Sequence, residues 1–162
     1  MAVVVERGGL ESIERVAPMW ETLRRHHVAV VPHLPAQPPL RSWELRRELY
    51  ESVLAEPDAF VLVACEDGAD LGYAVVALHG GPDDTWVTGD RIAEVETLAV
   101  VPAARGRGIG TALLDRVDEE LATLGVHDLR IAVVPANVAA MRFYERRGLV
   151  PFLTVLGRFS ER

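Results

Sequence analysis

The sequence has a single cysteine, Cys65, and no uninterrupted apolar stretch near the roughly 18 residues that a membrane-spanning helix needs. A lone cysteine cannot form an internal disulfide. Because Cys65 ends the apolar run VLVAC, we expect a small core side chain in a reduced, cytoplasmic setting. The start, MAVVVERGGL, lacks a basic leader followed by a long apolar core, so we expect no secretory signal and no membrane contact.

Basic side chains are also in the minority. The 162 residues hold 24 Asp and Glu against 17 Lys and Arg, which gives a formal net charge of −7 at pH 7. This balance disfavours a surface that neutralises the phosphates of nucleic acids or anionic lipids, so we expect neither as a partner. No internal repeat or low-complexity linker divides the chain, and we expect one domain over residues 1–162.

The apolar pattern predicts an α/β fold with a mixed sheet. Segments with helical spacing of apolar residues alternate with short apolar runs bounded by Gly, Pro and Asp, which are typical of strands. Ser42 and Asn137 are candidate helix caps, and Gly125 and Gly148 are expected just beyond helix ends. The predicted helices span residues 10–23, 41–55, 109–124 and 138–147, and the predicted strands span residues 2–5, 59–67, 71–80, 91–101, 127–135 and 149–159.

Residues 98–114, LAVVPAARGRGIGTALL, join a strand to a helix through a glycine-rich turn. Glycines let the backbone approach a ligand, and the N–H groups at a helix start attract an anion. Arg105 and Arg107 add two positive charges, and no acidic residue lies between Val100 and Leu114 to cancel them. The segment therefore predicts a site for phosphate, and for a pyrophosphate in particular. Taken alone, the glycines also suit a tight connection that binds nothing.

Spacing separates the families that use such a turn. A P-loop, GxxxxGK[ST], requires a lysine that this segment lacks, and a dinucleotide fingerprint, GxGxxG, meets Thr111 or Leu113 where it requires glycine. The segment matches [RQ]-x-x-G-x-[GA] at residues 105–110. This resembles the acetyl-coenzyme A signature of the GNAT superfamily of N-acetyltransferases. The resemblance continues through Asn137 and FYERRGLV at residues 143–150.

The resemblance implies a fold and an acetyl donor. The fold would be a GNAT-like mixed, mostly antiparallel sheet flanked by helices, with the glycine-rich loop between strand 4 and helix 3. The donor would be acetyl-CoA, in an opening where the strand with residues 98–100 splits from the strand with residues 131–134. The N–H of Val100 would stabilise the oxyanion of the reaction. The residues implied in binding the donor are Leu98, Ala99, Val100, Arg105, Gly106, Arg107, Gly108, Ile109, Gly110, Thr111, Asn137 and Tyr144.

Acetyl transfer to an amine also needs a base and an acid. Glu94 and Glu96 alternate with Val95 on a predicted strand, so both carboxylates leave the same face, about 6.6 Å apart along it, and we expect the pKa of at least one to be raised. We favour Glu96 slightly over Glu94 as the base, and a solvated strand face is the alternative. Tyr144, which shares a helix face with Asn137, is the acid that the resemblance implies, and a core aromatic is the alternative.

The expected function is transfer of an acetyl group from acetyl-CoA to a primary amine of a small molecule or peptide, by direct attack. The acidic balance suits a cationic acceptor, such as a polyamine, an aminoglycoside, or a protein N-terminus or lysine. A non-catalytic acyl-CoA-binding regulatory module and an acyltransferase that uses another acyl-CoA remain alternatives. The five histidines show no metal-ligand spacing, so we expect no metal. A homodimer through residues 149–159 is a further implication of the resemblance.

Overall fold

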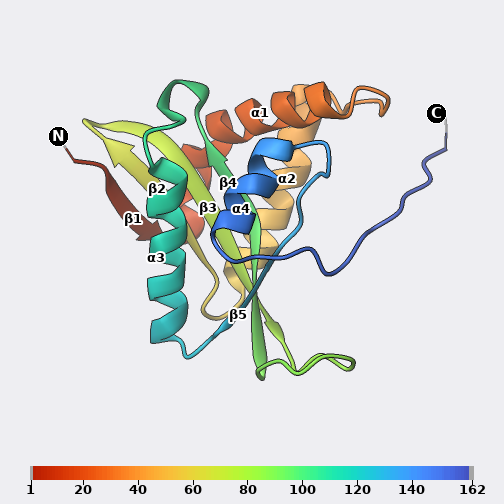
Figure 1. The fold of residues 1–162 in the computed structure, drawn as a ribbon. Coiled ribbons are helices and arrows are strands. Elements are labelled where there is room, and N and C mark those ends of the chain that lie inside the picture. The colour runs from red at the N-terminus through yellow and green to blue at the C-terminus, as the bar shows by residue number, and fades with distance from the viewer. Residues whose placement is uncertain (1, 161–162) are drawn as a thin grey trace. The chain divides into compact units, whose positions relative to one another are not determined.

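Five strands form one sheet in the computed structural model, which describes residues 2–160 (Figure 1). In spatial order they are β1 (Val4–Gly8), β2 (Phe60–Glu66), β3 (Ala69–Gly80), β4 (Arg91–Val100) and β5 (Asp128–Ile131). The first four strands pair antiparallel with their neighbours, whereas β5 runs parallel to β4. The mixed, mostly antiparallel sheet expected from the sequence is confirmed.

The chain divides into two compact units, residues up to 132 and residues from 133. The first unit contains the sheet, α1 (Ile13–Val30), α2 (Pro39–Ala55), α3 (Ile109–Thr123) and two single turns of 3₁₀ helix, Leu10–Ser12 and Pro102–Ala104. The second contains α4 (Val138–Arg146), where Asn137 Oδ1 accepts a hydrogen bond from the Ala140 N–H at 3.3 Å. The cap predicted at Asn137 is therefore confirmed.

The first unit has a core layer on each face of its sheet. One layer packs the sheet against α3, and the other packs it against α1 and α2 (Figure 1). Successive residues of β2 contribute to opposite layers, which explains why its sequence is apolar without interruption. The layer facing α3 includes Phe60, Leu62, Val76, Val95, Ile109, Leu113 and Val117, and the layer facing α1 and α2 includes Ile13, Val16, Tyr50, Val61, Val63, Tyr73 and Val75.

A buried chain of three hydroxyls links α2 to the sheet. Tyr50 Oη donates to Thr97 Oγ1 at 2.6 Å and lies 2.9 Å from Tyr73 Oη, which therefore donates to Tyr50. The two tyrosines are 0% exposed and Thr97 is 4% exposed. Because each hydroxyl has a partner, α2 packs over β3 and β4 without leaving a buried polar group unsatisfied.

The strand or strands predicted over residues 149–159 are wrong. Residues 149–160 form neither helix nor strand, and most of their apolar side chains, such as Val155 and Leu156, are exposed. Apolar and β-branched residues favour a strand only where a neighbouring strand supplies hydrogen bonds and packing. Pro151 also removes one backbone donor.

Two smaller expectations also need correction. α2 begins at Pro39, before the predicted cap, because proline is tolerated in the first turn of a helix, where N–H groups have no partner in the helix. Ser42 is instead a buried residue of α2 that accepts a hydrogen bond from the Trp20 indole N–H at 3.2 Å. Cys65 is half-buried near the end of β2 and not in the core, and burial and the nearby Glu6 raise its pKa.

We predict that Tyr50→Phe lowers the stability of the fold. The substitution leaves the hydroxyls of Tyr73 and Thr97 buried without their shared partner, which costs about 1 to 3 kcal/mol. Thermal unfolding would show this loss as a fall in Tm of roughly 2 to 12 °C for a chain of this size. An unchanged Tm would contradict a structural role for the hydroxyl chain.

Candidate active site

The segment between β4 and α3 leaves the start of α3 open to a ligand. Gly106 and Gly108 adopt φ angles of 74° and 81°, and a Cβ at either position would meet no atom within 4 Å. Within the described chain, no side chain caps α3 and no acidic residue lies in its first turn, which starts at Ile109. The free N–H groups and the partial positive charge of a helix start form a geometry that binds phosphate.

The two arginines of this segment are held in different ways. Arg105 Nε donates to the Val100 carbonyl at 3.2 Å, which ties the loop to the end of β4. Arg107 Nη2 lies 2.5 Å from Glu66 Oε2 at the end of β2, and this pair lowers the pKa of Glu66. The charge of Arg107 is therefore offset by a residue 41 positions away, which a count of charges along the segment could not include.

β4 and β5 pair over only part of β4. The parallel register joins Ile92–Val95 to Asp128–Ile131, while β4 continues to Val100. The backbone of residues 98–100 therefore has no pairing with β5 in the described structure. This stretch of β4 is a strand edge that β5 leaves unpaired, where Arg105 already bonds the Val100 carbonyl, and an extended ligand with amide groups can hydrogen-bond to such an edge.

A β-bulge interrupts β4 at Glu96, between its paired and its free stretch. Thr97 lies opposite Val75 of β3 and Val95 lies opposite Val76, so Glu96 has no residue opposite it. A bulge of this kind adds one residue to a strand and redirects the side chains around it.

The bulge reverses the alternation of side chains along β4. Val95 belongs to the core layer that faces α3, and Leu98 also packs against that layer, although three positions separate them. Glu96 and Thr97 lie between them, and successive side chains of a strand point to opposite faces, so both leave the side of the sheet that faces α3. Thr97 reaches Tyr50 of α2 on the other side, so Glu96 also projects toward the layer of α1 and α2.

Glu94 is held by two basic residues that the sequence did not single out. Arg130 of β5 places Nε and Nη2 each 2.6 Å from Glu94 Oε2, and His79 Nε2 of β3 lies 3.3 Å from the same oxygen. One ligand atom from each of His79, Glu94 and Glu96 lies within 4.8 Å of the others, a spacing that a metal ion could use. Because two N–H groups of Arg130 already occupy Glu94 Oε2, we interpret the cluster as an ion pair.

Glu96 has a different environment from Glu94. Its pKa is raised, first by burial and then by the charge of Glu94, while His79, Arg46 and Arg130 act in the opposite direction. Among the described residues it makes no ion pair. The raised pKa expected for at least one of the two carboxyls is therefore found at Glu96. A partly buried carboxylate with a raised pKa is a candidate general base.

The other two predicted site residues belong to the second unit. Asn137 precedes α4 and uses its side-chain oxygen to cap it. Tyr144 of α4 is buried, its ring meets the Phe143 ring edge-on with centroids 5.1 Å apart, and burial raises the pKa of its phenol. A phenol, whose ordinary pKa is about 10, is protonated at neutral pH and can act as a donor.

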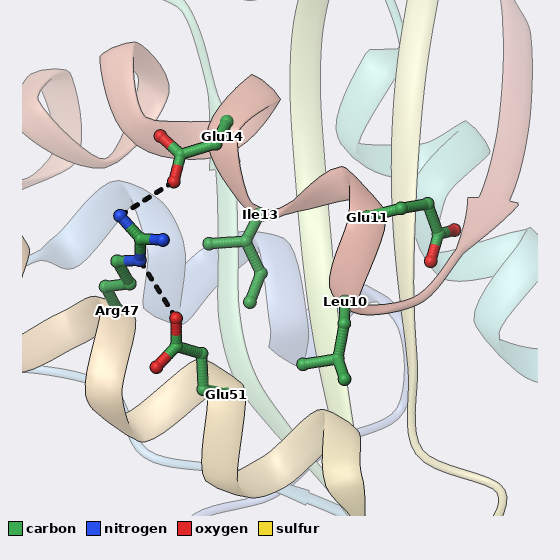
Figure 2. Close-up of a pocket in the computed structure, with 6 residues that line it drawn as sticks. All are labelled: Leu10, Glu11, Ile13, Glu14, Arg47 and Glu51. Atoms are coloured by element: carbon green, nitrogen blue, oxygen red, sulfur yellow. Dashed lines mark hydrogen bonds and ion pairs between the residues drawn. The ribbon is translucent and has the colours of Figure 1, made fainter.

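A cavity of about 520 Å³ lies elsewhere in the first unit, between the start of α1 and α2 (Figure 2). Arg47 bridges Glu14 and Glu51 across it at 2.9 Å each, so the charge of its guanidinium is satisfied (Figure 2). The cavity is lined by Leu10, Glu11, Ile13, Glu14, Arg47 and Glu51, and none of these is a predicted site residue. We therefore assign it no part in the candidate site.

His79 and Arg130 were missed because they join the site through pairing between strands. The sequence shows that residues 71–80 form a strand, but it does not show which of them lies beside Glu94. Only the register of β3 on β4 brings His79 near that carboxylate. Arg130 lies directly opposite Glu94 in the parallel pairing with β5.

Residues 20–149 match the family model described as "Acetyltransferase (GNAT) family". The fold is similar to that of a GCN5-related N-acetyltransferase from Ralstonia eutropha, with a TM-score of 0.78 and 21% identity over 98% of this chain and 99% of that one. A putative acetyl transferase from Pyrococcus furiosus gives a TM-score of 0.77 and 25% identity over 98% of this chain and 100% of that one.

Among curated proteins, mycothiol acetyltransferase of Paenarthrobacter aurescens is 31% identical over 97 residues, which cover 59% of this chain and 28% of that protein. The matched segments span between 28% and 57% of the length of the first three curated relatives. In the part of the chain that the structure describes, no helix is both long and apolar enough to cross a membrane.

Two matched substitutions separate the roles of the carboxylates. The pKa of Glu96 is raised in the folded protein, so the ionised carboxylate lowers the stability of the fold at any pH above the usual pKa of 4.5. Glu96→Gln should therefore raise Tm at pH 7 and leave it unchanged near pH 3. Glu94→Gln removes the partner of Arg130 and should lower stability at pH 7 by about 0.5 to 1 kcal/mol, or roughly 1 to 4 °C in Tm. Thermal unfolding at both pH values checks this, and shifts of the same sign at pH 7 would contradict it.

Proposed function

Because the chain belongs to the acetyltransferase (GNAT) family, we propose that it transfers the acetyl group of acetyl-CoA to a primary amine of a small molecule or peptide. The observation that carries the proposal is an arrangement in chain order along β4. The bulge presents Glu96, the next residues form a free strand edge, and the loop then opens the uncapped start of α3. In this order, Glu96 would serve the amine nucleophile, the strand edge would serve the thioester arm, and the start of α3 would serve the pyrophosphate.

The donor would be held mainly by backbone groups. The N–H groups of residues 107–111 would bind the pyrophosphate, and the main chain of Leu98, Ala99 and Val100 would pair with the pantetheine arm. Arg105 and Gly106 would shape the loop, since Arg105 bonds the Val100 carbonyl and Gly106 has a φ of 74°. The free stretch of β4 and the open start of α3 support this assignment. Acetyl-CoA would supply the thioester carbonyl that the amine attacks.

Glu96 would act as the general base. An alkyl amine with a pKa of about 10.4 must lose a proton before it can attack, at a cost of roughly 4.6 kcal/mol at pH 7. Glu96 would take that proton, directly or through water, and the neutral amine nitrogen would then bond to the thioester carbonyl carbon. Its raised pKa makes it a stronger base than an exposed carboxylate, and Glu94 is engaged with Arg130.

Val100 and Tyr144 would complete the reaction. The Val100 N–H would donate to the oxygen of the thioester carbonyl as negative charge develops on it, and one such donor is typically worth about 3 to 4 kcal/mol. The C–S bond would then break as the Tyr144 phenol gives its proton to the departing thiolate, and the phenolate would regain a proton, directly or through water, from the nitrogen as the amide forms. Asn137 would hold the pantetheine arm. A phenol is protonated at neutral pH, so Tyr144 has a proton to give.

We predict that acetyl-CoA stabilises the fold. At 100-fold excess over its Kd, binding should add about 2.7 kcal/mol and raise Tm by roughly 5 to 10 °C, whereas NAD and ATP should not. Gly108→Ala should reduce the shift because alanine is strained at the φ of 81° that the loop requires.

Gly68→Ala is the matched control, because Gly68 has a similar φ of 80° in the turn between β2 and β3. Without ligand, Gly68→Ala should lower Tm about as much as Gly108→Ala does, but it should leave the shift with acetyl-CoA intact. The absence of any shift with the native chain, shown to be folded and free of bound CoA, would contradict the proposed function. A shift without turnover on any amine would indicate a binding module.

A second prediction concerns Tyr144. Tyr144→Phe should lower kcat tenfold or more, because phenylalanine fills the same volume but has no proton to give. Affinity for acetyl-CoA should change little, which the shift in Tm with the donor would show. An unchanged kcat under steady-state conditions would remove Tyr144 from the mechanism.

A further inference from the structure

Arg46 of α2 is directed toward the sheet, at the place where α1, α2 and β4 meet. Its Cζ lies 4.0 Å from the centre of the Trp20 ring and 5.6 Å from the centre of the Tyr50 ring. The hydroxyl of that same Tyr50 bonds to Thr97, which follows Glu96 at the bulge. The positive charge of Arg46 opposes the rise in the pKa of Glu96, which agrees with this placement.

Arg46 has no carboxylate partner among the described residues. Within the described part of the first unit, only Arg46 and Arg105 among the arginines make no ion pair, and Arg105 bonds the Val100 carbonyl instead. The adjacent Arg47 bonds two glutamates on the outside of the helix pair. A partly buried guanidinium is always charged, so a position without an anion is costly unless a ligand supplies one.

The position of Arg46 over the Trp20 ring leaves its guanidinium N–H groups available to a ligand. A guanidinium that lies over an aromatic ring uses its flat face, while its N–H groups remain free around the edge. Two parallel N–H groups match the two oxygens of a carboxylate, which makes such pairs strong and selective for a planar anion.

We propose that Arg46 binds a carboxylate of the acetyl acceptor, so that the acceptor is an amino-acid-like compound with an amine and a carboxylate in one molecule. The inference rests on the proposed function and narrows its substrate class. Glu96 and Arg46 form a pair of opposite charges that complements an acceptor with an ammonium and a carboxylate. A polyamine or an aminoglycoside would place a second cation near Arg46, so the net charge of the whole chain is a poor guide to the acceptor.

The test uses acceptors in pairs that differ only by the carboxylate: lysine with 1,5-diaminopentane, and 2,4-diaminobutyrate with 1,3-diaminopropane. The native chain should show a kcat/KM at least tenfold higher for the carboxylate member of a pair. Arg46→Gln should lower that value about tenfold to a hundredfold, mainly through KM, and should leave the diamine within threefold. Arg46→Lys should retain part of the preference, because it keeps the charge but not the planar N–H edge.

Arg47→Gln is the matched control, since it removes the same charge from the next residue of α2 and should keep the native preference. The inference would be overturned if the native chain showed no preference for the carboxylate acceptors, or if Arg46→Gln lowered kcat/KM equally for both members of a pair. Either result would leave the proposed acetyl transfer intact. Absence of turnover on every acceptor would instead contradict the proposed function. In that case, calorimetric titration of both members of each pair into the CoA-saturated protein tests the role of Arg46 without turnover. Tighter binding of the carboxylate member, abolished by Arg46→Gln, would support the inference. Equal binding of both members, or no binding, would overturn it.

Discussion

The β-bulge at Glu96 is the constraint on which the rest of the candidate site depends. One unpaired residue in the β3–β4 ladder turns both Glu96 and Thr97 toward the layer of α1 and α2. Thr97 then anchors Tyr50 through a buried hydroxyl, and Tyr50 forms part of the surface over which Arg46 stacks. Without the extra residue, the alternation along β4 would send either the carboxylate or the hydroxyl into the layer that faces α3.

Electrostatic pairing distinguishes residues that stabilise the fold from residues that are available to a ligand. Glu94 has its charge satisfied by Arg130, and Arg107 has its charge satisfied by Glu66. Glu96 and Arg46 have no such partner in the described structure, and both lie where α2 meets β4. Charged groups that are partly buried and unpaired are costly to stability, and such costs concentrate at functional sites.

The features that follow from local chemistry could be predicted from the sequence, whereas those that depend on pairing could not. The cap at Asn137 and the loop into α3 depend on residues close together in the chain, and both were predicted at the correct positions. The bulge, His79 and Arg130 depend on strand register, which residue spacing within one strand does not encode. The strand predicted over residues 149–159 failed for the same reason, because an apolar run becomes a strand only beside a partner.

The proposed site depends on a carboxylate of β4, that of Glu96, whose pKa is raised by its surroundings. Titration of the glutamate side-chain carboxyl carbons by NMR measures this pKa directly, with the Glu96 signal identified by its absence from Glu96→Gln. We predict a midpoint for Glu96 above the usual 4.5, with exposed glutamates in the same spectra as the internal reference. A midpoint at or below 4.5 would mean that Glu96 is a solvated or paired carboxylate, and it would contradict the role of the bulge in forming a base.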